Sequence, residues 1–395
     1  MAYLDHAATT PMYPAAVAAM CEMLADPGNP SSLHASGRKA RRHVEESREQ
    51  VARVVGARPG EVIFTAGGTE ANNIAIKGLA WAARNARPHK NRLVISSVEH
   101  HAVLDPVQWL VDDDGFEVTW IKATETGEIT AEALVEALGP NADDVALVSV
   151  MLANNEVGTI NDIASLTEVT RGMGIGFHTD AVQAPMWLEV NFAQLGVCAM
   201  SISGHKFGGP TGAGALIMSR DCKATPLIHG GGQERELRSG TLDTPSIVGL
   251  ASALVQANQE RPETVARVRS LRDQLIAGVQ AIDPDAIFNG ATENRLANNV
   301  HFSFPGALGD SLLMLLDAQG VECSVGSACS AGVPQPSHVL LAMGADPDLA
   351  RCTLRFSLGH TSTQADVDAL LATLPGALER ARRAGVPRAT AGAVK

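Results

Sequence analysis

The chain has 395 residues, which is long for one average domain and favours a large domain joined to a smaller one. Hydrophobic residues make up 45% and charged residues 19% of it, a balance typical of globular proteins and not of disordered ones. The 31 basic and 43 acidic side chains leave a net charge of -12, which argues against direct binding to a nucleic-acid backbone.

The beginning of the chain predicts a protein of the cytoplasm. The sequence MAYLDHAATTP has acidic and polar residues where a signal peptide would have basic residues followed by an apolar stretch. No apolar run approaches the length that a membrane-spanning helix needs. We therefore expect neither an export signal nor a membrane partner.

The six cysteines predict separate thiols. They are scattered without Cys-x-x-Cys spacing, so the pattern indicates neither a disulfide framework nor a structural zinc site. Cys329 stands in a run of small residues, which suits an accessible loop. For the others a buried, inert thiol is expected, and these are Cys21, Cys198, Cys222, Cys323 and Cys352.

Helical stretches alternate with short apolar runs between about residues 36 and 260. The runs are rich in β-branched residues and lack polar alternation, which is typical of strands buried on both faces of a parallel sheet. The pattern therefore predicts an α/β fold with helices covering the sheet. The expected strands span residues 62–66, 92–97, 145–151, 175–181, 199–203 and 214–218.

A smaller α+β unit is expected towards the end of the chain. Residues 260–282 have helical periodicity and would lead the chain out of the large sheet. The segments at 298–304, 321–326 and 353–359 are expected to be strands of this unit.

A lysine stands at the end of one predicted strand. In SISGHKFGGPTGAGAL the strand runs into Ser203, His205 and Lys206, and a glycine-rich loop follows. A lone lysine in a loop is ordinarily a solvated side chain. The flanking Ser and His donors favour another role, in which the lysine bonds covalently to a cofactor whose phosphate lies beside it.

A second strand end carries Asp180 and Gln183, in the sequence FHTDAVQA. A carboxylate at this place can pair with the protonated ring nitrogen of pyridoxal 5'-phosphate (PLP) and keep the ring an electron sink. The alternative for Asp180 is an ordinary helix cap. The strand-end lysine further along the chain favours the cofactor role.

Glycines mark a third strand end, in FTAGGTEANN. Gly68 and Thr69 stand at a strand-to-helix turn, where backbone N–H groups and the helix dipole suit a phosphate. Many α/β proteins have such turns, so this signal is weak by itself.

Two more strand ends carry polar side chains. His100 and His101 follow one strand, and either could stack on a cofactor ring and move protons or be structural. Asn154, Asn155 and Glu156 follow the strand at 145–151, as polar groups suited to the ring hydroxyl or the substrate. Open α/β sheets bind ligands at the carboxyl ends of their strands. We therefore expect one group of residues at one sheet edge, consisting of Thr69, His100, Asn155, Asp180, Gln183 and Lys206.

The sequence closely resembles the NifS/IscS-type cysteine desulfurases of the class V PLP-dependent, aminotransferase-like family. The similarity runs from YLDHAATTP at residue 3 to LRFSLGH near residue 360. Between these ends it includes GNPSSLHASG, FTAGGTEANN, EHHAVL, ANNEVG, HTDAVQA, SGHKFGGP, GGGQERELRSGT and GSACSAG.

The resemblance implies a role for each matching residue. Lys206 would hold PLP covalently, and His100 would stack on the ring and act as an acid or base. Arg355 would pair with the substrate carboxylate, a task suited to a forked guanidinium. Asn155 would support the ring hydroxyl and help bind the substrate. Cys329 would accept the sulfur. The implied cofactor-binding residues are Gly68, Thr69, His100, Asn155, Asp180, Gln183, Ser203, His205, Lys206 and Thr241.

The resemblance also implies an architecture. It is the type I fold of PLP-dependent transferases, with a large, mostly parallel seven-stranded sheet, helices on both faces and a smaller α+β domain. Residues 15–260 would form the large domain, and residues 1–14 and 261–395 the small domain that carries the Cys329 loop. Two copies would form a homodimer in which Thr241 reaches into the other subunit.

The implied reaction removes sulfur from L-cysteine, giving L-alanine and a persulfide on Cys329 for sulfur-acceptor or scaffold proteins. The sulfur could serve iron–sulfur cluster assembly, tRNA or DNA thio-modification, or thio-cofactors. No stable metal site is expected, although Cys329 could be a transient iron–sulfur ligand. The alternatives are a selenocysteine lyase, a class V aminotransferase and an inactive scaffold, the last opposed by the complete set of pocket residues.

Overall fold

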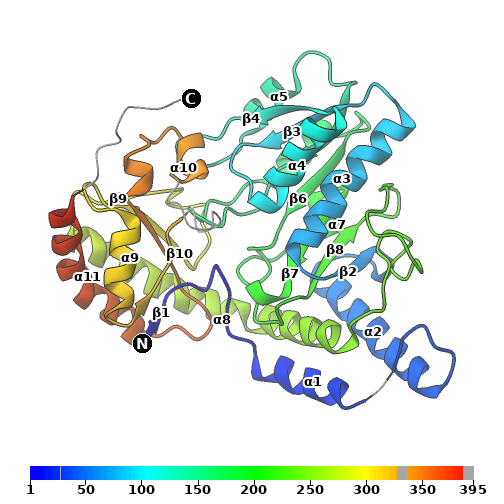
Figure 1. Cartoon of the computed structure of the whole chain (residues 1–395), viewed down its shortest axis with the longest axis horizontal. Coiled ribbons are helices and arrows are strands. Elements are labelled where there is room, and N and C mark those ends of the chain that lie inside the picture. The colour runs from blue at the N-terminus through cyan, green and yellow to red at the C-terminus, as the bar shows by residue number, and fades with distance from the viewer. Residues whose placement is uncertain (27, 327–335, 386–395) are drawn as a thin grey trace.

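The computed structural model describes residues 1–26, 28–326 and 336–385. A seven-stranded sheet forms the centre of the larger part, with the strand order β2-β8-β7-β6-β5-β3-β4 (Figure 1). β8 runs antiparallel to both of its neighbours, and the remaining neighbours pair in parallel. The strands are β2 (Val62–Thr65), β3 (Arg92–Ser96), β4 (Glu117–Ile121), β5 (Val145–Ser149), β6 (Gly176–Asp180), β7 (Ala199–Ser203) and β8 (Gly214–Met218).

The expected α/β fold with a mostly parallel sheet is confirmed. All six strands expected in this part are present within a residue or two of their predicted ends. The seventh strand, β4, was not predicted. It lies at the edge of the sheet and leaves Glu117 and Trp120 exposed, so it lacks the continuous apolar run of a buried strand.

Helices cover both faces of the sheet because successive strand residues point to opposite sides. In β3, Leu93 and Ile95 belong to the core under α3 (Gly68–Ala86) and α4 (His101–Asp114). Val94 belongs to the core on the other face. The helices of that face are α2 (Ala35–Val54), α5 (Ala131–Leu138), α6 (Ile163–Thr170) and α7 (Phe192–Leu195).

The smaller part contains two small sheets. The strands β9 (Ile287–Phe288), β10 (Asn299–Ser303) and β12 (Thr353–Ser357) pair antiparallel in the order β12-β10-β9. β1 (Ala2–Tyr3), at the beginning of the chain, pairs in parallel with β11 (Val321–Glu322). The helices here are α9 (Gly309–Asp317), α10 (His338–Ala342) and α11 (Gln364–Ala384).

One long helix, α8 (Thr244–Ile282), passes under both parts (Figure 1). Near its beginning it packs against α2 and α1 (Pro14–Leu24), and it also contacts α11 and β10 of the smaller part. The predicted domain boundary between residues 260 and 261 falls inside this helix, and it stays a prediction.

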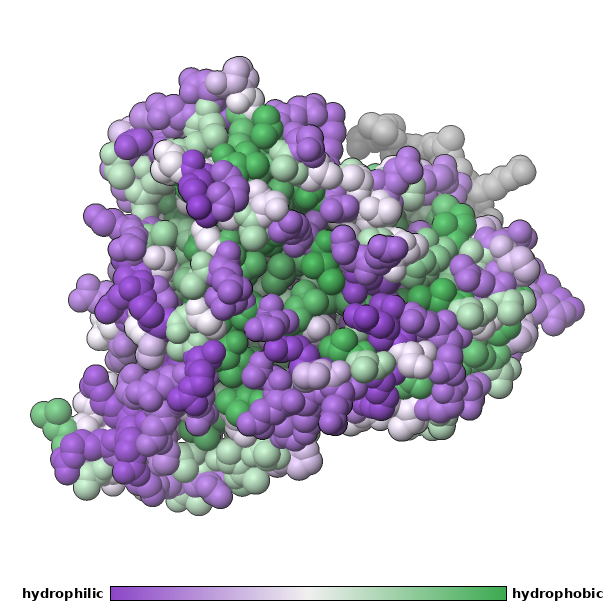
Figure 2. Space-filling model, turned by 180° about the vertical axis from the view of Figure 1, so that it is seen from behind, coloured by the Kyte–Doolittle hydropathy of each residue, from purple (hydrophilic) through white to green (hydrophobic). Residues whose placement is uncertain are grey.

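One face of the molecule has a hydrophobic centre and a hydrophilic border. Seen from behind, hydrophobic side chains gather in the middle of the molecule, and hydrophilic ones cover most of the remainder (Figure 2). Within the part of the chain that the structure describes, no helix combines the length and the apolar character needed to cross a membrane.

The prediction of separate thiols is wrong for one pair. Cys198 and Cys222 form a disulfide with their Cα atoms 6.0 Å apart. Cys198 directly precedes β7 and Cys222 follows β8, and the antiparallel pairing of these strands brings the two ends together. Cys21 is exposed, which is also contrary to expectation, whereas Cys323 and Cys352 are buried thiols as predicted.

Candidate active site

A cavity of about 360 Å³ opens at the carboxyl edge of the large sheet. Residues that follow β5, β6 and β7 line it, together with the beginning of α3, the residue before α4 and the first residues of the chain. β12 of the smaller part closes one side. The lining residues that carry the argument are Asp5, Gly68, Thr69, Asn72, His100, Asn155, Asp180, Gln183, Ser203, His205, Lys206 and Arg355.

Lys206 lies in a short turn directly after β7. A single 3₁₀ turn, Gly204–Lys206, carries the side chain to the sheet edge. Its Nζ donates hydrogen bonds to the backbone oxygens of Ala7 at 2.7 Å and Ala8 at 2.8 Å. The first residues of the chain therefore direct the amine into the cavity.

Asp180 is the last residue of β6 and is 5% exposed. Its Oδ2 accepts a hydrogen bond from Asn72 Nδ2 at 2.6 Å, and its Oδ1 accepts one from the backbone N–H of Val182 at 2.9 Å. Nearby, Gln183 Nε2 donates to the backbone oxygen of Ala7 at 3.0 Å. The carboxylate is thus held in place with its charge stabilised by two donors.

The beginning of α3 forms a close-fitting wall. A Cβ atom on Gly68 would lie 2.8 Å from Val182 Cγ2 and 3.3 Å from Ser203 Cβ, so a larger residue would crowd the wall. Ser203 is 2% exposed, and its side chain borders the same corner of the cavity as His205 and Thr69. Unpaired N–H groups at a helix beginning and nearby hydroxyl groups are a natural seat for a phosphate.

His100 caps α4. Its Nδ1 accepts a hydrogen bond from the backbone N–H of Ala102 at 3.0 Å, so in the neutral ring Nε2 carries the hydrogen. Burial lowers the pKa of His100, opposed by the nearby Asp180, so the ring is neutral at pH 7. His101 instead is exposed and pairs with Asp105 at 3.0 Å, outside the cavity.

Burial also affects the histidine beside the lysine. It lowers the pKa of His205 to about 4, and the neighbouring Lys206 cation adds to the effect. His205 is therefore neutral near pH 7. In that state it can donate one hydrogen bond without adding charge.

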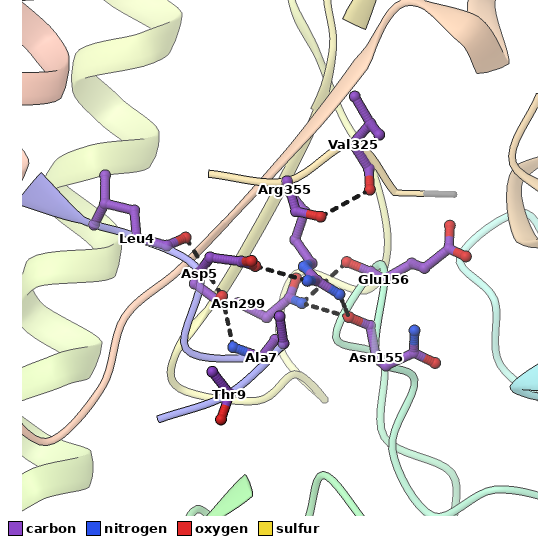
Figure 3. A network of polar contacts seen from close by, with 12 residues as sticks. Leu4, Asp5, Ala7, Thr9, Asn155, Glu156, Asn299, Val325 and Arg355 are labelled. Carbon is purple, nitrogen blue, oxygen red and sulfur yellow. Dashed lines mark hydrogen bonds and ion pairs between the residues drawn. The ribbon is translucent and has the colours of Figure 1, made fainter. Parts of the chain in front are cut away.

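Arg355 closes the cavity from the smaller part (Figure 3). It lies in β12 and is 5% exposed. Its Nη2 donates to Asp5 Oδ1 at 2.9 Å, and its Nη1 donates to the backbone oxygen of Asn155 at 2.9 Å. These two hydrogen bonds use two of the five N–H groups of the guanidinium, and its buried Nε has no partner among the described residues.

Residues 2–370 match the family model of the class-V aminotransferases. An IscS-like cysteine desulfurase of Mycobacterium tuberculosis is 58% identical over 99% of this chain and 100% of its own length. The chain belongs to the class-V aminotransferase family. Within it, the relatives are of the NifS/IscS type, as the sequence resemblance implied.

Solved structures of related proteins have the same fold as this class-V member. A NifS-like protein superposes with a TM-score of 0.88 at 34% identity and covers 96% of this chain and 100% of its own. The structure of SspA in complex with cysteine gives a TM-score of 0.78 at 34% identity, covering 92% of this chain and 100% of its own. These likenesses confirm the expected type I fold.

One predicted site residue of this class-V chain, Thr241, does not line the cavity, and another, Cys329, cannot be placed relative to it. Thr241 is exposed and stands apart from the lining residues of its own chain. Cys329 lies outside the described residues, so its place relative to Lys206 stays a prediction. All the other predicted site residues line the one cavity.

Sequence reasoning missed Asn72 and Asp5. Asn72 stands one helical turn after Thr69, so its position on the same face of α3 was a signal that could have placed it. Asp5 belongs to the quoted YLDHAATTP segment, but its contact with Arg355 joins residues 350 positions apart, which no local pattern reveals. No group of three or more metal-ligating side chains occurs among residues 1–26, 28–326 and 336–385.

Proposed function

We propose that this class-V protein is a cysteine desulfurase that uses PLP and transfers the sulfur of L-cysteine to Cys329, releasing L-alanine. The observation that carries the proposal is the convergence of Lys206, Asp180 and the beginning of α3 in one cavity. Arg355 borders the same cavity from the smaller part. The names of the relatives, and the complex of SspA with cysteine, support the same activity.

The cavity residues fit PLP. Asp180 would pair with the ring nitrogen, Lys206 would bond to the aldehyde carbon, and Gln183 would contact the ring oxygen. Ser203 and the N–H groups at the beginning of α3 would bind the phosphate. A side chain at position 68 would collide with its neighbours there, so the glycine suits this wall. PLP, when bound, supplies an electron sink that stabilises negative charge on the substrate carbon.

The residues of this chain then have distinct tasks towards cysteine. Arg355 would bind the substrate carboxylate, with Asp5 and the Asn155 backbone oxygen fixing its guanidinium. Lys206 and His100 line the same cavity. The Lys206 amine can take the substrate's α-proton, and the Nε2–H of the neutral His100 can donate a proton. Because burial lowers the pKa of His100, its ring is neutral near pH 7, the state in which it can take part in proton transfer.

The sulfur step balances without another reactant. The Cys329 thiolate attacks the sulfur of the bound substrate, so that an S–S bond forms while the C–S bond breaks. The electron pair of the broken bond stays on carbon, which takes up a proton. The products are L-alanine and a Cys329 persulfide, and neither an external oxidant nor a reductant is consumed.

The partners proposed for this enzyme are a second copy of the chain and sulfur-acceptor or scaffold proteins in the cytoplasm. The exposed position of Thr241 supports a dimer, because a phosphate contact from that residue would have to be made in another subunit. The acidic charge supports acceptor proteins over direct contact with nucleic acid.

Cys329→Ser tests the proposal. The purified variant should bind PLP and show the same change in visible absorption on addition of L-cysteine, but it should form no persulfide and release no sulfide with a thiol. Alanine formation at the wild-type rate in this variant would contradict the role of Cys329.

Substrate tests separate the alternatives. Alanine and sulfide from cysteine, with no keto acid added, are expected for a desulfurase. A dependence on a keto acid would indicate an aminotransferase. Activity with selenocysteine alone would indicate a selenocysteine lyase.

A further inference from the structure

Residues 5–10, here called the N-terminal bend, lie beside the active-site cavity. The backbone N–H of Ala8 donates to the backbone oxygen of Asp5 at 3.0 Å and so closes a tight turn. The backbone oxygens of Ala7 and Ala8 accept the two hydrogen bonds from Lys206 Nζ, at 2.7 Å and 2.8 Å. Figure 3 shows Asp5 and Ala7 on this bend. The place of the lysine amine therefore depends on where the bend holds its main chain.

His6 is a buried side chain inside the N-terminal bend, and none of the steps above uses it. It is 3% exposed and does not line the cavity. Its Nδ1 lies 2.7 Å from Thr10 Oγ1, a contact that joins the two ends of the bend. Its Nε2 lies 3.3 Å from the Oγ of Ser362, which follows β12 in the smaller part. Both ring nitrogens therefore have a partner.

Further contacts fasten each end of the bend. At its beginning, the backbone N–H groups of His6 and Ala7 donate to the backbone oxygen and the Oγ of Ser357, at 3.2 Å and 2.8 Å. At its end, the backbone N–H of Thr10 donates to the backbone oxygen of His205 at 3.0 Å. His205 directly precedes the active-site lysine. Thr10 thus links the side chain of His6 to the turn that carries this lysine.

The protonation state of His6 suits a fixed support. Burial, together with the nearby His360, lowers the pKa of His6 to about 4, against the raising effect of Asp366. The ring is therefore neutral near pH 7, so one nitrogen donates and the other accepts. Loss of the ring would remove the shorter of the two histidine contacts that Thr10 Oγ1 makes, since the other, to His360, is 3.4 Å long.

We propose that His6 is a positioning residue for Lys206: by holding Thr10, it fixes the N-terminal bend, whose backbone oxygens hold the amine where the cofactor is attached. The inference rests on the proposed function. In the attachment, the amine nitrogen forms a C=N bond with the aldehyde carbon of PLP, and the aldehyde oxygen leaves as water with the two amine hydrogens. Loss of His6 should slow this step and spare non-covalent binding of the cofactor.

The experiment separates attachment from binding on the full-length protein, which is first freed of cofactor and then reloaded. Attachment is the rate at which visible absorption appears after mixing with PLP, verified by borohydride reduction and mass spectrometry. Non-covalent binding is the Kd for pyridoxine 5'-phosphate, which carries an alcohol in place of the aldehyde and cannot bond to lysine.

His6→Leu should slow the attachment by at least about tenfold, since misplacing a reacting group by 1 Å can cost about 10²-fold. The Kd for pyridoxine 5'-phosphate should stay within about threefold of the wild-type value, because Asp180 and the phosphate wall at the beginning of α3 are unaltered.

Conservative variants and a control make the test independent of a folding defect. His6→Asn should restore most of the rate, because the amide can place a polar atom close to where Nδ1 stands. Thr10→Val, which removes the hydroxyl and keeps the shape, should slow attachment selectively even if His6→Leu folds poorly, and Thr10→Ser should restore it. Thr170→Val is the matched control. Thr170 is as buried as Thr10, at 5% exposure, but its hydroxyl donates to the backbone oxygen of Thr167 outside the cavity.

The outcomes distinguish this inference from the function on which it rests. Wild-type protein that gains no covalent PLP overturns the role of Lys206 and this inference with it. Attachment at the wild-type rate in His6→Leu and Thr10→Val, or an equal slowing in Thr170→Val, overturns the positioning role of His6 and leaves the desulfurase assignment intact. A loss of pyridoxine 5'-phosphate binding that matches the slowing in His6→Leu and Thr10→Val also overturns the positioning role, because it would show a general disruption of the cavity.

Discussion

The two sides of the cavity are built in different ways. On the sheet side, Asp180 and Lys206 stand at the ends of adjacent strands, and the partners of Asp180 come from the same part of the molecule. On the opposite side, Arg355 is held by Asp5 from the beginning of the chain and by Asn155 from the large part. Regular strand pairing thus places the backbone of Asp180 and Lys206, on the proposed cofactor side, whereas contacts between distant segments place Arg355, on the proposed substrate side.

Lys206→Ala should have the largest effect. Without the amine the enzyme should neither retain PLP covalently nor form alanine from cysteine, so the loss is expected to be complete. Borohydride reduction followed by mass spectrometry would reveal a covalent cofactor adduct in the wild type and none in the variant. Lys122→Ala is a suitable control, because Lys122 is 84% exposed. A reduced adduct in Lys206→Ala would disprove the assignment.

Substitution of Arg355 should have the second largest effect. It should change cysteine binding without changing PLP binding. Arg355→Ala removes a buried, paired charge and should raise KM for cysteine by about 30-fold or more, corresponding to at least about 2 kcal/mol. Asp5→Asn should raise KM less, by about fivefold, because it loosens the guanidinium without removing it. PLP content should be unchanged in both. Loss of the cofactor from Arg355→Ala would mean that the two sides are not independent.

Asn72→Ala tests the sheet side of the cavity, where a substitution should weaken PLP binding and leave the KM for cysteine unchanged. Loss of the hydrogen bond to the buried Asp180 carboxylate should weaken PLP binding by about tenfold, since an unsatisfied buried acceptor costs about 1–3 kcal/mol. The KM for cysteine of fully loaded enzyme should hardly change. Titration of the apoenzyme with PLP provides the measurement, and Asn73→Ala, on the exposed side of the same helix, provides the control. An equal effect of the two substitutions would argue against the role of Asn72.

Glu99→Gln should change stability alone, so its effect on the reaction should be the smallest. Burial, assisted by Asp180, raises the pKa of Glu99 from 4.5 to about 8 in the folded protein. The native side chain keeps its proton, so its stabilising contribution is complete below pH 4.5 and is lost as the pH rises towards 8.

Wild type should therefore lose stability relative to Glu99→Gln by up to about 1.4 kcal/mol per pH unit in that window. Melting temperatures measured between pH 5 and pH 8 would show the two curves diverging. Parallel curves would indicate that Glu99 is ionised in the native protein.

The sequence predicted the sheet side of the site from physical reasoning alone. Asp180 and Lys206 lie at the ends of strands that are recognisable in the sequence as apolar runs. Parallel strands bring their carboxyl ends to one edge of the sheet. The proposed substrate side could be predicted only from the family resemblance. No local sequence pattern links Asp5 or Asn155 to Arg355, because these residues are far apart in the chain. The Cys198–Cys222 disulfide was missed for a related reason, since it depends on which strands become neighbours.

The attachment of the first residues has a consequence for the order of folding during synthesis. The backbone N–H of Ala7 bonds to Ser357 Oγ at 2.8 Å, across 350 positions, and β1 pairs with β11. Residues 2–7 can therefore reach their place only after residues 321–357 have been made. Because such distant contacts form slowly, we expect the surroundings of Lys206 to be completed in the last stage of folding, after the large sheet has assembled.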